Sequence, residues 1–119
     1  MKITLPWPPS TNHYWRTILI GGHPRTLISK QGRQYKKTVA ALLFGCESAI
    51  GRLAVRIEAF PPDRRKRDLD NICKSLLDAL GHGLVYADDS QIDELSLRRR
   101  SPEKPGRVEV EITPAENTP

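Results

Sequence analysis

The chain has 119 residues and a mass of 13.4 kDa, which suits one domain with one hydrophobic core. Its hydrophobic content of 38% and charged content of 28% argue against both a membrane protein and a disordered one, and the longest apolar run, 39–44, is too short to cross a bilayer. Nineteen Lys and Arg against fourteen Asp and Glu leave a net charge of +5. No secretory signal precedes Pro6, so we expect a cytoplasmic protein whose Cys46 and Cys73 are reduced and lie in or near the core.

The first part of the chain predicts strands and one helix. Residues 2–5 alternate as a short strand, and the prolines within 6–9 then exclude a sheet interior. Strands at 14–20 and 26–28, around a Gly-Gly-His-Pro turn, predict a hairpin. Ser29 is expected to cap a helix. Its apolar face at helical spacing would comprise Tyr35, Val39, Leu42, Leu43 and Cys46.

The second part of the chain adds a strand at 53–60, a helix at 70–80, and strands at 92–99 and 108–113 joined by a turn around 102–106. Gly81 or Gly83 is expected to end the helix in the left-handed conformation. The element order predicts a single α+β domain with two main helices over 1–113, followed by a flexible tail at 114–119.

An acidic motif at the start of the second helix carries the sharpest chemical signal. Asp68 and Asp70 are two residues apart, so an extended chain would direct both carboxylates to the same side, provided that the helix begins at about Asp70. Lys74 lies one helical turn beyond Asp70. Asp88 and Asp89 follow the helix, and the fold could return them to the first pair.

These residue types suit metal-assisted phosphoryl transfer. Carboxylates are the oxygen ligands that Mg²⁺ takes in proteins, and such an ion lowers the pKa of a bound water and clamps phosphoryl oxygens. A nearby lysine such as Lys74 stabilises charge that builds on the phosphate. The run Arg64, Arg65, Lys66 and Arg67, with a second cationic run at 98–100, suits the backbone of a nucleic acid.

Each of these features also has a purely structural interpretation. Asp68 or Asp70 is alternatively an N-cap, and Asp70 with Lys74 is alternatively an ordinary i,i+4 ion pair. Asp88 and Asp89 alternatively form a turn, and the cationic run alternatively forms a solvated loop. Trp7 and Trp15 fit stacking on bases, although packing in the core or on the hairpin is the favoured interpretation.

The sequence resembles the RusA family of Holliday junction resolvases over nearly its whole length. The resemblance rests on Leu-Pro-Trp-Pro-Pro-Ser at 5–10, on the stretch 29–35, on Pro-Asp-Arg-Arg-Lys-Arg-Asp-Leu-Asp-Asn at 62–71 with Lys74, on Asp-Ala-Leu at 78–80, and on Asp-Asp at 88–89 with Gln91. It implies a mixed β-sheet, a homodimer, and a magnesium-dependent endonuclease, with manganese as a substitute ion, that cuts four-way DNA junctions by paired incisions. These incisions would leave 5′-phosphate and 3′-hydroxyl ends and serve DNA recombination and repair.

The resemblance also implies roles for individual residues. Asp68, Asp70 and Asp89 would bind the metal, and with Lys74 they would form the catalytic set. The residues expected to contact DNA are Arg64, Arg65, Lys66, Arg67 and Asn71. No small-molecule cofactor and no membrane partner are implied, and a DNA substrate implies association with the nucleoid. Two rival functions stay open: a non-catalytic nucleic-acid-binding module, and a nuclease for other branched DNA such as forks or flaps.

Overall fold

The computed structural model describes residues 1–115. Its elements in chain order are β1 (Lys2–Pro6), α1 (Thr11–Tyr14), β2 (Trp15–Ile20), β3 (His23–Ile28), α2 (Lys30–Leu42), β4 (Leu53–Phe60), α3 (Asp70–His82), the 3₁₀ turn η1 (Asp89–Gln91), β5 (Ile92–Arg99) and β6 (Arg107–Pro114). The last strand includes Pro114, and the Ala115 amide donates to the Arg52 carbonyl at 2.9 Å. The sheet therefore continues into the predicted tail, the rest of which lies outside the described residues.

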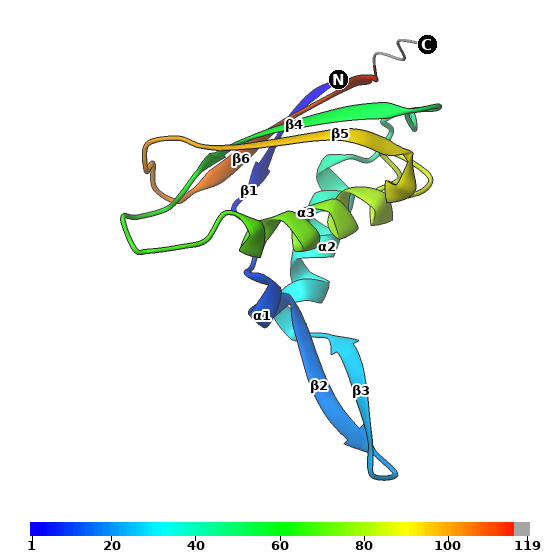
Figure 1. Ribbon diagram of the computed structural model, residues 1–119, viewed down its shortest axis with the longest axis vertical. Coiled ribbons are helices and arrows are strands. Elements are labelled where there is room, and N and C mark those ends of the chain that lie inside the picture. Colours follow the sequence, from blue (N-terminus) through cyan, green and yellow to red (C-terminus); the bar gives the residue numbers. More distant parts are fainter. Residues whose placement is uncertain (116–119) are drawn as a thin grey trace.

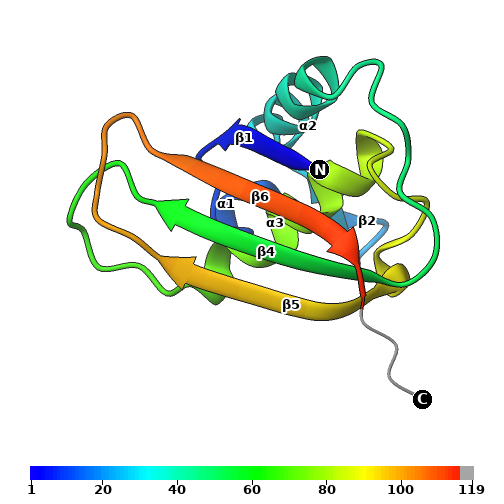
Figure 2. The same cartoon turned by 90° about the horizontal axis from the view of Figure 1, so that it is seen from above.

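Four strands form a mixed sheet in the order β1-β6-β4-β5, as Figure 2 shows from above. Strand β6 is antiparallel to both β1 and β4, whereas β5 is parallel to β4. The connection from β4 to β5 runs through α3, because parallel neighbours need a long crossover. The α+β class with a mixed sheet, expected from the sequence, is confirmed.

Helices α2 and α3 cover one face of this sheet (Figure 1). The predicted alternation in β4 is confirmed, because Leu53, Val55, Ile57 and Ala59 are all buried. They meet buried side chains of α2 and α3 and of Leu43, the residue that follows α2. These include Val39, Leu43, Ile72, Leu76 and Leu80. This core fixes α3 against the sheet and so fixes the loop that leads into α3.

Helix α2 begins as the sequence predicts and ends earlier. The Ser29 hydroxyl accepts from the Gly32 amide at 3.0 Å, which confirms the N-cap. Tyr35, Val39 and Leu43 are buried as expected. Leu42 is 55% exposed, and Cys46, beyond the helix end, is exposed, so their predicted places on the buried face are wrong. The helix stops at Leu42 before its apolar stripe is complete.

The end of α3 does not follow the predicted glycine cap. The helix continues to His82, and Gly83 has a φ of −76°, while the following Leu84 has a φ of 64°. The left-handed residue is therefore a leucine. Gly83 serves a packing purpose, because a Cβ there would lie 2.7 Å from Cδ1 of Leu43.

The hairpin is longer than predicted and starts from a short helix that the sequence did not indicate. α1 turns the chain into β2, and the turn consists of Gly21 and Gly22, since His23 and Pro24 already belong to β3. The hairpin projects away from the sheet and the two helices (Figure 1). No helix within residues 1–115 is long and apolar enough to cross a membrane.

Candidate active site and nucleic-acid interface

The basic loop between β4 and α3 folds around one carboxylate. Asp63 accepts from Nη1 of Arg67 at 2.8 Å and from the amide of Arg65 at 2.9 Å. These contacts hold the pKa of Asp63 below its usual range, with the Arg67 guanidinium as the largest cause. Arg64 and Lys66 are exposed and form no ion pair with any residue in the described range. The cations of this loop therefore divide into a structural pair and a pair available to a ligand.

The second cationic run comes back to the same loop. Arg99, at the end of β5, donates to the carbonyl of Arg67. Between them lies a groove of about 430 Å³. Its cationic walls comprise Arg64, Arg65, Lys66, Arg67, Arg99 and Arg100. Two runs that are about thirty residues apart in sequence thus form one positively charged surface, which suits the phosphates of a nucleic acid.

A second groove, of about 570 Å³, borders the other side of this loop. It is lined by Asp68 and Asn71 together with Trp7 and His13. The Arg67 guanidinium lies 5.9 Å from the centre of the Trp7 ring. Trp7 also packs partly against the core, so packing and a place in the groove are combined in one side chain. The predicted DNA contacts Arg64, Arg65, Lys66, Arg67 and Asn71 all line one or both grooves.

Asp68 and Asp70 are not used as helix caps. The residue at the cap position of α3 is Leu69, and no side chain bonds to the first helical amides. Both carboxylates are exposed, and neither has a hydrogen bond or ion pair with another described residue. Lys74 does not pair with Asp70 either. Its Nζ lies 5.9 Å from the centre of the Trp15 ring. The two local structural alternatives for this motif are therefore absent from the structure.

The backbone between the two aspartates differs from the sequence expectation. Leu69 has helical angles, with φ of −60° and ψ of −38°, so Asp68 and Asp70 are not related by the alternation of an extended chain. The predicted reason for convergence of the two carboxylates is wrong. Both side chains are nevertheless exposed, and that of Asp68 lines a groove with the cationic loop.

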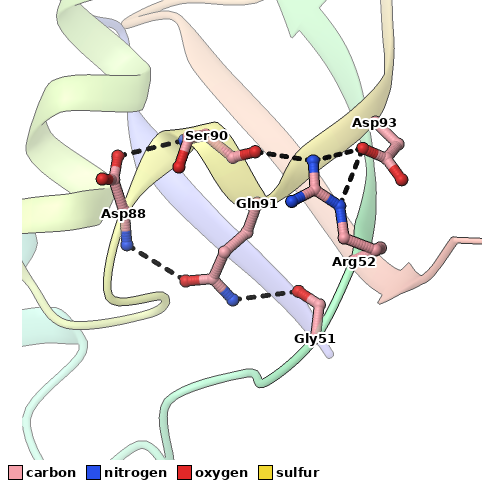
Figure 3. A network of polar contacts seen from close by, with 6 residues as sticks. All are labelled: Gly51, Arg52, Asp88, Ser90, Gln91 and Asp93. Atoms are coloured by element: carbon pink, nitrogen blue, oxygen red, sulfur yellow. Dashed lines mark hydrogen bonds and ion pairs between the residues drawn. The ribbon is translucent and has the colours of Figure 1, made fainter.

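Asp88 and Asp89 differ in structural role, and Asp88 caps the 3₁₀ turn η1. The Asp88 carboxylate accepts from the amide of Ser90 at 3.0 Å, and its own amide donates to Oε1 of Gln91 at 3.0 Å. Figure 3 shows this capping box and its anchors, in which Gln91 donates to the Gly51 carbonyl and Arg52 donates to that of Ser90. The turn interpretation is thus right for Asp88.

The same turn fixes the position of Asp89, whose carboxylate has no part in the capping box. A hydrogen bond with Asp88, partial desolvation, and the negative charges of Asp88 and Asp78 raise the pKa of Asp89. The amide and hydroxyl of Ser90 and the bond from Asp89 hold the pKa of Asp88 low. Asp89 is therefore the carboxylate of this pair that is held close to other acidic groups, which is a setting that favours a bound cation.

Asp89 and the pair Asp68 and Asp70 do not form a single cage in this chain. Within residues 1–115, no three His, Cys, Asp or Glu side chains are grouped closely enough to hold one metal ion. Asp89 is instead electrostatically linked to Asp78, which lies about 12 Å along the axis of α3 from Asp70 at ~1.5 Å per residue. The expectation that the three aspartates meet in one pocket is not confirmed.

Asp78 is a residue whose role the sequence did not indicate. It accepts a hydrogen bond from the buried Tyr14 hydroxyl of α1 and lies 3.7 Å from Nζ of Lys36 of α2. One carboxylate therefore ties all three helices together. Its spacing of eight residues from Asp70 corresponds to a rotation of about 80° around α3, so the sequence carried no direct signal of these contacts.

Comparisons with known proteins show the family to which the chain belongs. The family described as "Endodeoxyribonuclease RusA" matches residues 6–113. The chain is 41% identical over 114 residues to a protein of Enterobacteria phage 82 named crossover junction endodeoxyribonuclease, covering 93% of this chain and 92% of the relative. It is 39% identical over 115 residues to the Escherichia coli K12 protein of that name, covering 94% and 92%. For the Enterobacteria phage HK97 protein, the identity is 37% over 119 residues, covering 98% and 96%.

Proposed function

Since this chain belongs to the RusA family of endodeoxyribonucleases, we propose that it cuts four-way DNA junctions by paired phosphodiester hydrolysis. The family membership carries the proposal, and the site supports it from an independent direction. Asp68 lines both cationic grooves, and Asp70 follows it at the start of α3; both are exposed and have no hydrogen bond or ion pair with another described residue. Carboxylates beside a phosphate-binding surface would repel the DNA unless a cation neutralises them, which is the arrangement that a metal-dependent nuclease requires.

The donor types fit a hard divalent cation. Mg²⁺ is bound in proteins by one or two carboxylates together with waters and substrate phosphates, so a complete protein cage is not required. Asp68 and Asp70 would hold the ion, and Asp89, which is not grouped with them within residues 1–115, would have to approach them when the ion and DNA bind. Mn²⁺ would substitute for Mg²⁺ because it takes the same oxygen ligands. When bound, the ion supplies a water of lowered pKa and neutralises phosphoryl oxygens.

The protein side chains would bind the DNA and stabilise charge in the transition state. Arg64 and Lys66, which have no internal partner in the described range, would bind phosphates on either side of the cut. Lys74, on the exposed face of α3 one turn after Asp70, would stabilise the negative charge that increases on the phosphate as the bond breaks. Asn71 would position the backbone from the second groove.

We also propose that the active form is a homodimer located in the cytoplasm at the nucleoid. A four-way junction has approximate two-fold symmetry, and a two-fold dimer presents two identical sites to opposing strands. A sedimentation experiment should find a species of about twice 13.4 kDa.

The test is incubation with a labelled synthetic four-way junction and Mg²⁺. Symmetrically nicked duplex products are expected, with little cutting of a linear duplex of the same sequence. A shift in gel mobility without any nick would make the protein a binding module. Preferential cutting of forks or flaps in competition with the junction would assign it to another branched substrate.

A further inference from the structure

The β2–β3 hairpin is the most exposed element of the chain. It projects from the helices with nothing beside it beyond its base (Figure 1). Between residues 16 and 27 every side chain is exposed except that of Ile18, which is half-buried. Leu19 and Ile20 are 72% and 55% exposed. A lone two-stranded hairpin is marginally stable in water, so a binding partner would add stability to this arm.

The charge of the arm indicates the kind of partner. Residues 1–46 contain no Asp or Glu, so all ionised side chains on the hairpin are cationic. In the strand register Arg16 faces Leu27, Ile18 faces Arg25, and Ile20 faces His23, so the basic residues share one face of the ribbon. The whole chain carries +5, and this charge favours a polyanion over a second copy of the chain on that face.

The tip of the arm is apolar and narrow. Gly21 and Gly22 have φ values of 58° and 81°, which gives the tight turn typical of two-residue hairpins. Leu19 and Ile20 immediately precede this turn and point to opposite faces of the ribbon. The end of the arm therefore presents apolar side chains at its leading edge, on a ribbon of the width that fits into the major groove of DNA.

The base of the arm borders the proposed cleavage site. A groove of about 600 Å³ is lined by Lys74 together with residues of the arm, among them Trp15, Thr17 and Thr26. The hydroxyl of Thr11, just before the arm, donates to the carbonyl of Asn71 at 2.9 Å. Thr17 and Thr26 belong to the face of the ribbon opposite to Arg25, but Arg16 also lines this groove. DNA held at Lys74 would therefore reach the cationic face of the hairpin at Arg16.

The base is also held in place by close packing. A Cβ on Gly32 would lie 2.5 Å from the Tyr14 carbonyl oxygen and 2.8 Å from Cγ2 of Ile28, so only glycine allows α2 to pack against the start and end of the hairpin. The Ser29 amide donates to the same Tyr14 carbonyl at 2.8 Å. The direction in which the arm leaves the body is therefore fixed by the fold.

We propose that the β2–β3 hairpin is an arm that binds branched DNA, with Arg16, Arg25 and His23 along the phosphates of one duplex arm and Leu19 and Ile20 against base pairs opened at the branch point. The inference rests on the proposed function, because it takes branched DNA as the ligand. Apolar side chains inserted at unstacked base steps are an established way for proteins to recognise deformed DNA. Opened pairs at a branch cost less to unstack than pairs within a duplex.

The test compares the full-length Leu19→Ser/Ile20→Ser variant with wild type by fluorescence anisotropy. The ligands are a labelled four-way junction and a linear duplex, in EDTA so that no cleavage occurs. We expect junction affinity to fall about tenfold and duplex affinity less than about twofold, because the tip contacts only opened base pairs. A 2-aminopurine placed at the branch should brighten with wild type and not with the variant. Phe44→Ser/Ile50→Ser, which replaces side chains that are 91% and 88% exposed elsewhere, should behave as wild type.

A second variant addresses the cationic face. Arg16→Ala/Arg25→Ala should weaken binding to both DNAs and reduce the slope of log affinity against log salt by about 1.8, or ~0.9 for each lost phosphate contact. An unchanged junction-to-duplex ratio in the tip variant would overturn the proposal. A second result would also overturn it: the tip variant loses affinity because the protein dissociates into smaller species, and the arginine variant keeps the wild-type salt slope. The arm would then be a contact between subunits. These readouts concern binding alone, so a wild-type protein that fails to cut the junction would refute the proposed function separately.

Discussion

Nη1 of Arg67 lies 2.8 Å from the carboxylate of Asp63, and this ion pair organises the basic loop in front of α3. Arg65 is also close to Asp63, at 3.7 Å. Phosphates therefore compete with an internal carboxylate for two of the four cations in the loop. Arg64 and Lys66 have no such competitor within the described chain, so they should carry most of the electrostatic attraction for DNA.

The first prediction concerns these two cations. Arg64→Ala/Lys66→Ala should reduce the slope of log junction affinity against log salt concentration by about 1.8, since each lost phosphate contact removes ~0.9. Titrations at several salt concentrations in EDTA measure the slope. Arg56→Ala/Lys37→Ala removes the same charge from an exposed strand position and from α2, and should change the slope much less. Equal effects of the two double variants would show that the DNA does not follow the basic loop.

The second prediction concerns Lys74. Lys74→Ala should slow junction cleavage about 10²–10³-fold, or ~2.7–4 kcal/mol of barrier, the range for removal of one donor that stabilises charge in the transition state. Single-turnover cleavage at saturating protein isolates this step from binding. Lys37→Ala, on the exposed surface of α2, is the matched control. If Lys74→Ala weakens binding while leaving the single-turnover rate intact, the lysine is a phosphate clamp.

The third prediction concerns stability at alkaline pH. The three tyrosines of the chain, Tyr14, Tyr35 and Tyr86, are buried, and burial is the largest cause that raises the pKa of each above 10. A raised folded-state pKa gives stability that is present below the unfolded pKa and is lost as the pH rises above it. The free energy of unfolding should therefore decrease above pH ~10, by about 1.4 kcal/mol per pH unit for each tyrosine that stays protonated in the folded state.

Tyr35→Phe tests this directly, because burial is the one cause that raises its pKa. The variant loses the hydrogen bond to the Pro6 carbonyl at 2.8 Å, so its stability at neutral pH should fall by about 0.5–1.5 kcal/mol. Above pH ~10 its stability should decline less steeply than that of wild type by about 1.4 kcal/mol per pH unit. Urea unfolding between pH 8 and 11 gives both quantities. Parallel curves for the two proteins would mean that Tyr35 ionises equally in the folded and unfolded states.

The sequence predicts the regular elements well and their ends less well. The alternation of 53–60 and the Ser29 cap depend on local spacing, and both are confirmed. The end of α2 depends on what packs beyond it, so Cys46 was wrongly assigned to the buried face. The left-handed residue after α3 is Leu84, although glycine is the usual choice, and Gly83 instead allows close packing against Leu43.

The candidate site also contains features that the sequence predicts and contacts that it does not. The local pattern at 64–74 predicts a site of phosphate chemistry, because a cationic run lies beside two aspartates and a lysine. The sequence does not predict the contact of Arg99 with Arg67, because this contact depends on where β5 ends relative to the loop. Asp78 belongs to a short motif, Asp-Ala-Leu at 78–80, but its contacts with Tyr14 and Lys36 depend on the packing of three helices.

The most direct test of the metal-dependent nuclease is Asp70→Asn. This change removes one carboxylate ligand and one negative charge while the cations remain, so cleavage of a four-way junction in Mg²⁺ should be abolished and junction binding in EDTA should be retained or strengthened. Asp68→Asn and Asp89→Asn should behave in the same way. Glu47→Gln, an exposed acid outside the site, should cut as wild type does. Magnesium-dependent cleavage by Asp70→Asn at the wild-type rate would contradict the assignment.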